Sequence, residues 1–140
     1  VNLDAAYGAV GYVLSMADHA VYPHHFSPPI TWAPLVWLAL AAVIVGETLA
    51  GVLCGFGAWS MWRARRGSAG AFRRASETAV LGCGVAVVVW LGLFMAVGGA
   101  WFQMWQTEGG GNSLEGAFMY ALSSAVVLLF VNQPEAPPAP

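Results

Sequence analysis

The chain has 140 residues, enough for one small domain at most. Its composition excludes an ordinary soluble domain, because 59% of the residues are hydrophobic and only 9% are charged, against about a quarter charged in soluble proteins. The net charge of −2 conceals an uneven distribution, since every basic residue is an arginine between positions 63 and 74. A short basic cluster between apolar segments is typical of a topology signal and argues against nucleic-acid binding. The composition therefore predicts an integral membrane protein.

The first part of the chain, residues 1–31, is predicted to form a segment on the outer side of the membrane. Residues 5–16 are mildly apolar, but Gly8 and Gly11 interrupt the run, and it lacks the basic region that begins a signal peptide. We expect this part to lie partly in the membrane interface.

Three later segments are long and apolar enough to cross a bilayer, and they are residues 33–60, 79–105 and 114–131. A hydrocarbon core of about 30 Å requires about 20 helical residues. Open strands are excluded because a lipid-exposed segment must satisfy its own backbone hydrogen bonds. The predicted fold is an all-α integral membrane protein, with three transmembrane helices in a helical domain at residues 32–131.

The arginines orient these spans. Positive residues concentrate in cytoplasmic loops, so residues 62–78 are predicted to form a cytoplasmic loop. Its basic residues are expected to contact lipid headgroups, and they are Arg63, Arg65, Arg66, Arg73 and Arg74. The proline-rich tail, residues 132–140, is then cytoplasmic and extended. On the outer side, the glycines at 109–111 are expected to form a flexible turn between the second and third spans.

Tryptophans mark the ends of the predicted spans. Indole rings are enriched at both membrane interfaces, where they form aromatic belts. Six are assigned to the belt: Trp32, Trp37, Trp59, Trp62, Trp101 and Trp105. Trp90 falls in the middle of a span and is expected to pack against another helix instead.

The second span ends in an unusual segment, residues 98–107, with the sequence GGAWFQMWQT. Together with Asn2, Asp4 and Tyr7 near the start and Glu47 in the first span, this segment resembles a family of small bacterial integral membrane proteins, domain of unknown function 2165. The resemblance runs from the first residue to about Phe118. It implies an integral membrane fold, in a multi-pass protein of the bacterial inner membrane, and no established activity.

Two departures from the family pattern accompany this resemblance. The family usually has a glutamate where this chain has Ala100, so one carboxylate at the membrane boundary is absent. Family members also usually begin with a further hydrophobic span before the position of Asn2, which gives four helices in the full-length protein. Three expectations stay open for this chain: the first helix is missing from this sequence, it has been cleaved, or the protein has three spans.

Glu47 is the sharpest functional signal in the sequence, because a charged side chain in mid-span costs about 2.5–3.5 kcal/mol. It adjoins small residues spaced four apart, which let helices approach closely. The predicted helix–helix interface consists of Ala42, Gly46, Glu47, Ala50, Gly51, Cys54 and Gly55. Two interpretations stay open: Glu47 is a protonated carboxyl that joins two helices or binds a partner subunit, or it relays protons or ions.

Other chemically active residues give weaker signals. Metal binding is not expected, since the residues that come closest to a site, His19, His24 and His25, match no closed ligand motif. Cys54 and Cys83 lie at similar depth and are interpreted as free thiols that pack as small apolar groups. The predicted spans contain no histidine, so the chain offers no usual axial ligand for haem, and no cofactor is expected.

The sequence contains no nucleophile–base pair and no paired carboxylates, so we do not expect an enzyme. We expect a non-catalytic accessory or structural subunit of a larger membrane complex, such as a bacterial respiratory or photosynthetic electron-transfer assembly. Its expected partners are other integral membrane subunits and phospholipids, and no nucleic acid. The alternative is a small homo-oligomeric transporter or channel that uses Glu47 as a proton or ion relay.

Overall fold

The computed structural model describes residues 2–22 and 27–133, and every element in these ranges is helical. The elements are α1 (Leu3–Ser15), α2 (Ala33–Ala64), α3 (Ala69–Val87), the π-helix η1 (Val88–Trp101), the short 3₁₀ helix η2 (Met104–Gln106) and α4 (Glu108–Val131). Within these ranges, three continuous helices are long and apolar enough to cross a membrane: Ala33–Ala64, Ala69–Trp101 and Glu108–Val131. The predicted all-α fold with three candidate spans is confirmed.

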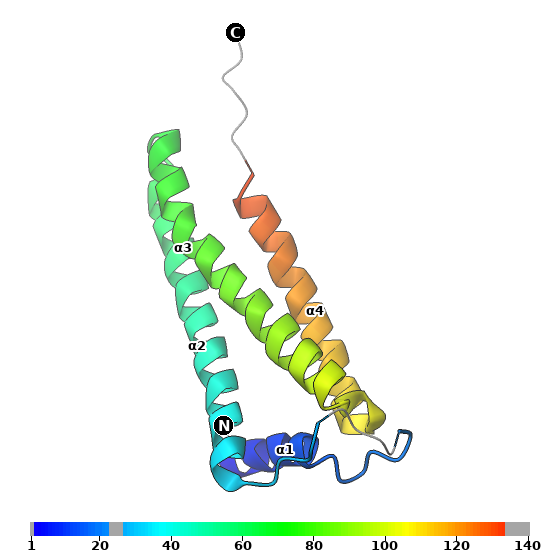
Figure 1. Ribbon diagram of the computed structural model, residues 1–140. Helices are drawn as coiled ribbons and strands as arrows, with labels where there is room; N and C mark the ends of the chain where they lie inside the picture. The colour runs from blue at the N-terminus through cyan, green and yellow to red at the C-terminus, as the bar shows by residue number, and fades with distance from the viewer. Residues whose placement is uncertain (1, 23–26, 134–140) are drawn as a thin grey trace.

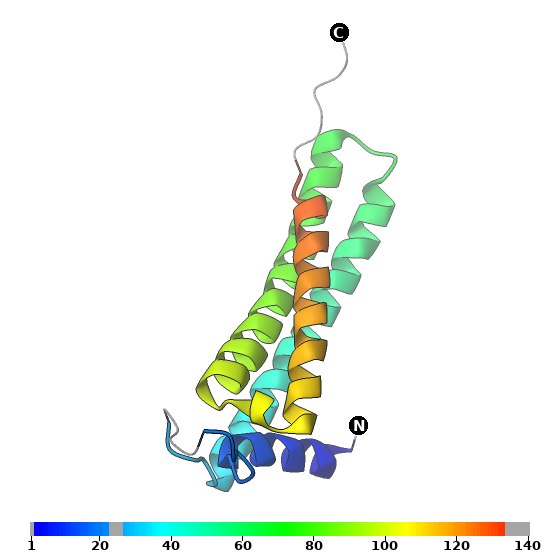
Figure 2. The same ribbon diagram turned by 90° about the vertical axis from the view of Figure 1, so that its right-hand side faces the viewer.

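The three long helices run antiparallel to their sequence neighbours, and α1 lies crosswise at one end of them (Figures 1 and 2). α2 and α3 are close together at the end that carries their connecting turn. Towards α1, α2 and η1 separate, so that the pair forms a V in the view of Figure 1. α4 packs against η1 and α3 on the side away from α2.

The arginine-rich connection is much shorter than the predicted loop at residues 62–78. α2 continues to Ala64 and α3 begins at Ala69, where the Ser68 hydroxyl accepts a hydrogen bond from the Ala71 amide at 3.3 Å. Arg73 and Arg74 therefore lie on the first turns of α3 rather than in a loop. Alanine and arginine are good helix formers, and serine is a favoured N-cap, so both helices extend past their apolar segments.

The predicted boundaries of the other two spans also change. The second helix ends at Trp101 instead of residue 105, and its second half, residues 88–101, is a π-helix, closed by a hydrogen bond from the Phe102 amide to the Val97 carbonyl at 2.9 Å. α4 begins at Glu108, so the glycines at 109–111 are helical and the predicted flexible turn is wrong.

The glycines at the start of α4 are required by a close approach. The Thr107 hydroxyl accepts a hydrogen bond from the Gly110 amide at 3.1 Å and thereby caps the helix. A β-carbon on Gly110 would collide with the carbonyl oxygen of Met104 and lie 2.8 Å from the Thr107 hydroxyl. Only glycine lets the α4 N-terminus fold back so tightly onto η2.

Small residues line the contact between α2 and the α3–η1 helix. A β-carbon on Gly46 would lie 2.6 Å from Val89 Cγ2, and one on Gly57 would lie 2.6 Å from Ala79 Cα. Ala50 and Ala86, which lie between these two contacts along their helices, are both buried. Close backbone approach over small residues is how membrane helices gain packing energy, because lipid provides no hydrophobic driving force.

A separate apolar cluster holds α1 against the start of α2. Leu14 and Met16 pack with Val36 and Phe102, and the Tyr7 ring lies 4.7 Å from the Trp37 ring. α1 ends where Met16 adopts a left-handed conformation with φ of 52°. The crosswise helix is thus attached through its apolar side to one end of the bundle.

Candidate functional site

Glu47 lies near the middle of α2, about 21 Å from the start of the helix and about 26 Å from its end at 1.5 Å per residue. Its side chain is exposed. Within the part of the chain that the structure describes, it forms no hydrogen bond or ion pair. The chain thus places a carboxyl group in the centre of a candidate span without covering it.

The structure separates the two small-residue stripes that the sequence joins into one interface. Gly46, Ala50 and Cys54 face α3 and η1. Gly51 and Gly55 are exposed, and a β-carbon on either would meet nothing within 4 Å. The described chain therefore does not cover Glu47, Gly51 and Gly55, and the predicted interface at these three residues stays a prediction about a partner helix. Neighbouring residues of a helix are rotated by about 100° around its axis. The stripe that begins one residue later, at Glu47, is therefore turned away from the contact with α3.

Ala42 also has a different place from the one predicted, because it lines a cavity instead of a tight helix contact. The cavity has a volume of about 200 Å³ and lies between α1, α2 and η1, where the arms of the V diverge. Val13, Val43 and Phe94 contribute to its walls, one from each helix. Its lining is apolar apart from Ser113. No pattern in the sequence indicates this cavity, because it depends on the angle between two helices.

Glu47 stands beside this cavity on α2. Val36, Leu40, Val43 and Glu47 follow one another at spacings of four, three and four residues, which places them along one side of the helix. Val36 and Leu40 are buried, and Val43 lines the cavity. Glu47 is the first residue along this side of α2 whose side chain is exposed.

The end of the molecule near α1 is held together by Gln106, which belongs to the Trp-rich segment at residues 98–107. Its Oε1 accepts hydrogen bonds from the backbone amides of Val21 and Tyr22, both at 3.0 Å. Its Nε2 donates to Gln103 Oε1 at 2.6 Å. The Tyr22 ring also meets the Trp105 ring edge-on at 5.8 Å. The Trp-rich segment therefore anchors the chain that follows α1.

The histidine cluster does not assemble in the described residues. His24 and His25 lie outside them, and His19 is buried. Asp18, the nearest acidic residue, accepts a hydrogen bond from the Tyr12 hydroxyl at 2.8 Å. This bond and the charge of Asp18 raise the pKa of Tyr12, since both favour the protonated phenol.

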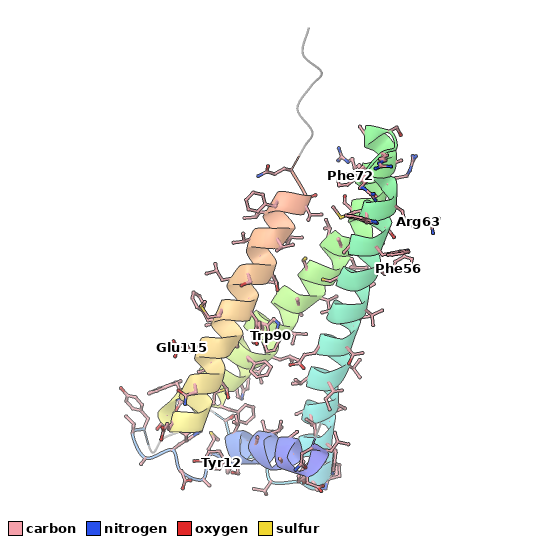
Figure 3. The ribbon with its side chains drawn as sticks, turned by 180° about the vertical axis from the view of Figure 1, so that it is seen from behind. Tyr12, Phe56, Arg63, Phe72, Trp90 and Glu115 are labelled. Carbon is pink, nitrogen blue, oxygen red and sulfur yellow. The ribbon has the colours of Figure 1, made fainter. Side chains whose placement is uncertain are left out.

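The tryptophans assigned to the belt are all exposed, with at least 44% of each side chain accessible. They are Trp32, Trp37, Trp59, Trp62, Trp101 and Trp105. Trp90 differs, because its ring stacks on Tyr120 of α4 at 4.9 Å and packs against Phe94 at 5.0 Å. Figure 3 shows Trp90 among the helices, whereas Phe56 points away from them.

The arginines gather at the opposite end from α1, around the α2–α3 turn. The Arg65 guanidinium lies over the Trp62 ring, 3.8 Å from its centre, and donates a hydrogen bond to the Trp62 carbonyl at 2.8 Å. Arg63 extends from α2 beside this turn (Figure 3). Arg73 lines a second cavity, of about 460 Å³, between the start of α3 and the end of α4. The basic residues therefore form one cationic end of the bundle.

The family comparison agrees with this architecture. The model of the family described as "Predicted small integral membrane protein (DUF2165)" matches residues 1–134. The chain belongs to this family and is an integral membrane protein. No curated protein and no solved structure matches it.

Proposed function

We propose that this member of the small integral membrane protein family is a non-catalytic subunit that binds another membrane-embedded helix through one side of α2. The observation that carries the proposal is the exposed stripe of Glu47, Gly51 and Gly55, which we call the open stripe. The other helices of the described chain pack against the adjacent stripe and leave this one uncovered.

Glu47 is energetically costly to leave exposed to lipid. A charged side chain at the centre of a span costs about 2.5–3.5 kcal/mol, and even a protonated carboxyl retains a hydrogen-bond donor that lipid cannot satisfy. A partner helix with a polar side chain or a free carbonyl removes this cost. Gly51 and Gly55 supply the flat surface on which such a helix approaches closely, as in small-residue motifs of membrane dimers.

The ends of the molecule support a fixed placement in the bilayer. The arginines at the α2–α3 end suit anionic headgroups, each contributing on the order of 1 kcal/mol near the surface. Because positive residues concentrate in the cytoplasm, our proposal places this end inside and α1 outside. Cysteines introduced at Gly70 and Thr31, in a chain with both native cysteines replaced by alanine, report the two sides. Impermeant maleimide should label position 31, not position 70, in intact cells.

The larger assembly is tested by purification. Solubilised in mild detergent, the protein should co-migrate in fixed stoichiometry with larger membrane proteins on a native gel, and mass spectrometry identifies them. Redox subunits among these proteins would support the more specific expectation of a bacterial electron-transfer assembly. A particle built from copies of this chain alone would contradict the subunit proposal and favour the transporter alternative.

Substitutions on α2 test whether the open stripe contacts the partner helix. Gly51→Leu or Gly55→Leu should abolish co-migration by steric exclusion, while Glu47→Gln should retain it, because the amide still forms hydrogen bonds. Val45→Leu is the matched control, since Val45 is exposed and lies outside the open stripe. If Glu47→Gln leaves assembly intact but abolishes a proton-coupled activity, Glu47 is a relay and its structural role is wrong.

A further inference from the structure

Two free thiols face each other across the contact between α2 and α3. The Sγ atoms of Cys54 and Cys83 are 3.9 Å apart. Cys83 is buried, and Cys54 is half-buried. The sequence places them at similar depth, where they could approach one another, and the structure brings them together as a pair.

The neighbouring glycine explains how the thiols come together. A β-carbon on Gly82 would lie 2.6 Å from the backbone nitrogen of Cys54 and 2.8 Å from its Sγ. One turn along α2, Gly57 is in similarly close contact with Ala79. The backbones of α2 and α3 are therefore close together beside the two cysteines.

We propose that Cys54 and Cys83 form a redox-active dithiol, which a small peroxide oxidises to a disulfide that links α2 to α3. A disulfide has a sulfur–sulfur distance of about 2.05 Å, so the two sulfurs must approach by about 1.9 Å. Rotation about the Cα–Cβ bond of either cysteine changes this distance.

The reaction begins at Cys54, the less buried thiol. Its thiolate attacks one oxygen of hydrogen peroxide, the O–O bond breaks, and a sulfenic acid and hydroxide form. The Cys83 thiolate then attacks the sulfenic sulfur, the S–S bond forms, and the S–O bond breaks to release a second hydroxide. The two hydroxides take up the two thiol protons. Two thiols and one peroxide thus give one disulfide and two waters.

The side chains around Cys54 and Cys83 favour a dithiol over a zinc centre. Structural zinc sites use four ligands. Within residues 2–22 and 27–133, no group of three His, Cys, Asp or Glu side chains comes together. The pair lies on the side of α2 that faces α3, so a partner helix on the open stripe leaves it in place.

The disulfide ties α2 to α3 between the Gly57–Ala79 contact and the Gly46–Val89 contact. Between the cysteine pair and α1, Gly46 contacts Val89. Further towards α1, α2 and η1 lie apart (Figure 1), and the cavity of about 200 Å³ lies between them. Oxidation therefore links α2 and α3 where they are in contact and adds nothing to the cavity near α1.

The experiment counts thiols in the full chain, in native membranes, before and after treatment with hydrogen peroxide. After acid quenching and denaturation, a polyethylene-glycol maleimide should add two tags to the untreated chain and none to the oxidised chain. A reducing agent should restore both tags. The intact mass of the oxidised chain should fall by two hydrogens.

A matched control moves one thiol by a single position. In Cys54→Ala with Gly55→Cys, the new thiol lies on the open stripe, where nothing stands within 4 Å of a β-carbon. This variant should not lose two hydrogens under the same treatment. Two tags after oxidation of the natural chain, a covalent dimer, or oxygen addition without loss of hydrogen would overturn the proposal, as would disulfide formation in the control variant.

Discussion

Gly57 of α2 and Ala79 of α3 are in such close contact that a β-carbon on Gly57 would lie 2.6 Å from Ala79 Cα. Backbone atoms cannot move aside as the end of a flexible side chain can. Even one methyl group at position 57 therefore has to push the two helices apart. The crossing of α2 and α3 depends on this glycine more than on any property of the surrounding apolar residues.

Gly57→Ala should therefore lower the free energy of unfolding by about 1–3 kcal/mol, the usual cost of overpacking. Gly51→Ala is the control, because its β-carbon meets nothing within 4 Å. Alanine is the better helix former by about 0.5–1 kcal/mol, so this variant should be as stable as the natural chain or slightly more so. Denaturation in detergent micelles, followed by circular dichroism, measures both. Equal effects at the two positions would contradict the close contact.

The start of α4 offers a second comparison of adjacent glycines. Gly110→Ala should destabilise the turn before α4 by on the order of 1–3 kcal/mol, because its methyl group collides with the Met104 carbonyl. Gly109→Ala should cost nothing, since open space surrounds that position. Fluorescence of Trp105, which lies in this turn, follows unfolding in both variants. A flexible glycine turn would instead tolerate both substitutions alike.

Gln106 gives a prediction about local order. Gln106→Leu removes the acceptor of the Val21 and Tyr22 amides, so hydrogen exchange at these two amides should accelerate. Gln106→Glu keeps an acceptor oxygen for both amides and loses only the donor to Gln103, so their protection should persist. Exchange rates unchanged in the leucine variant would show that the hydrogen bonds do not hold this segment.

The pair of Tyr12 and Asp18 predicts a pH dependence. The hydrogen bond to Asp18 and its charge raise the pKa of Tyr12 above the ordinary value of 10.0. A raised pKa in the folded state means that the contribution to stability is fully present below about pH 10 and is lost as the pH rises through the folded-state pKa. Asp18→Asn should move the ultraviolet titration of Tyr12 back towards its ordinary value. An unchanged titration would contradict the contact.

Much of the architecture could be predicted from composition alone. Long apolar segments in lipid must be helical, so the number and type of the spans follow from the sequence without any contact between them. The residues at which the helices begin and end were less predictable. Ser68 and Thr107 begin helices that extend beyond the apolar segments, and the half of the second helix nearer α1 is a π-helix although its apolar composition does not distinguish it from an α-helix.

The candidate site shows where prediction from sequence ends. The sequence established that Glu47 lies in mid-span among small residues, because this depends only on position along one helix. It could not establish which small stripe packs inside the chain, since Gly46 and Glu47 are adjacent and both begin such a stripe. The tertiary structure decided this through the crossing with α3, which takes Gly46 and Cys54 into the contact and leaves Gly51 and Gly55 open. The pairing of Cys54 with Cys83 and the cavity beside Val43 follow from the same crossing, because rotation and angle between helices are properties of their packing and not of either sequence.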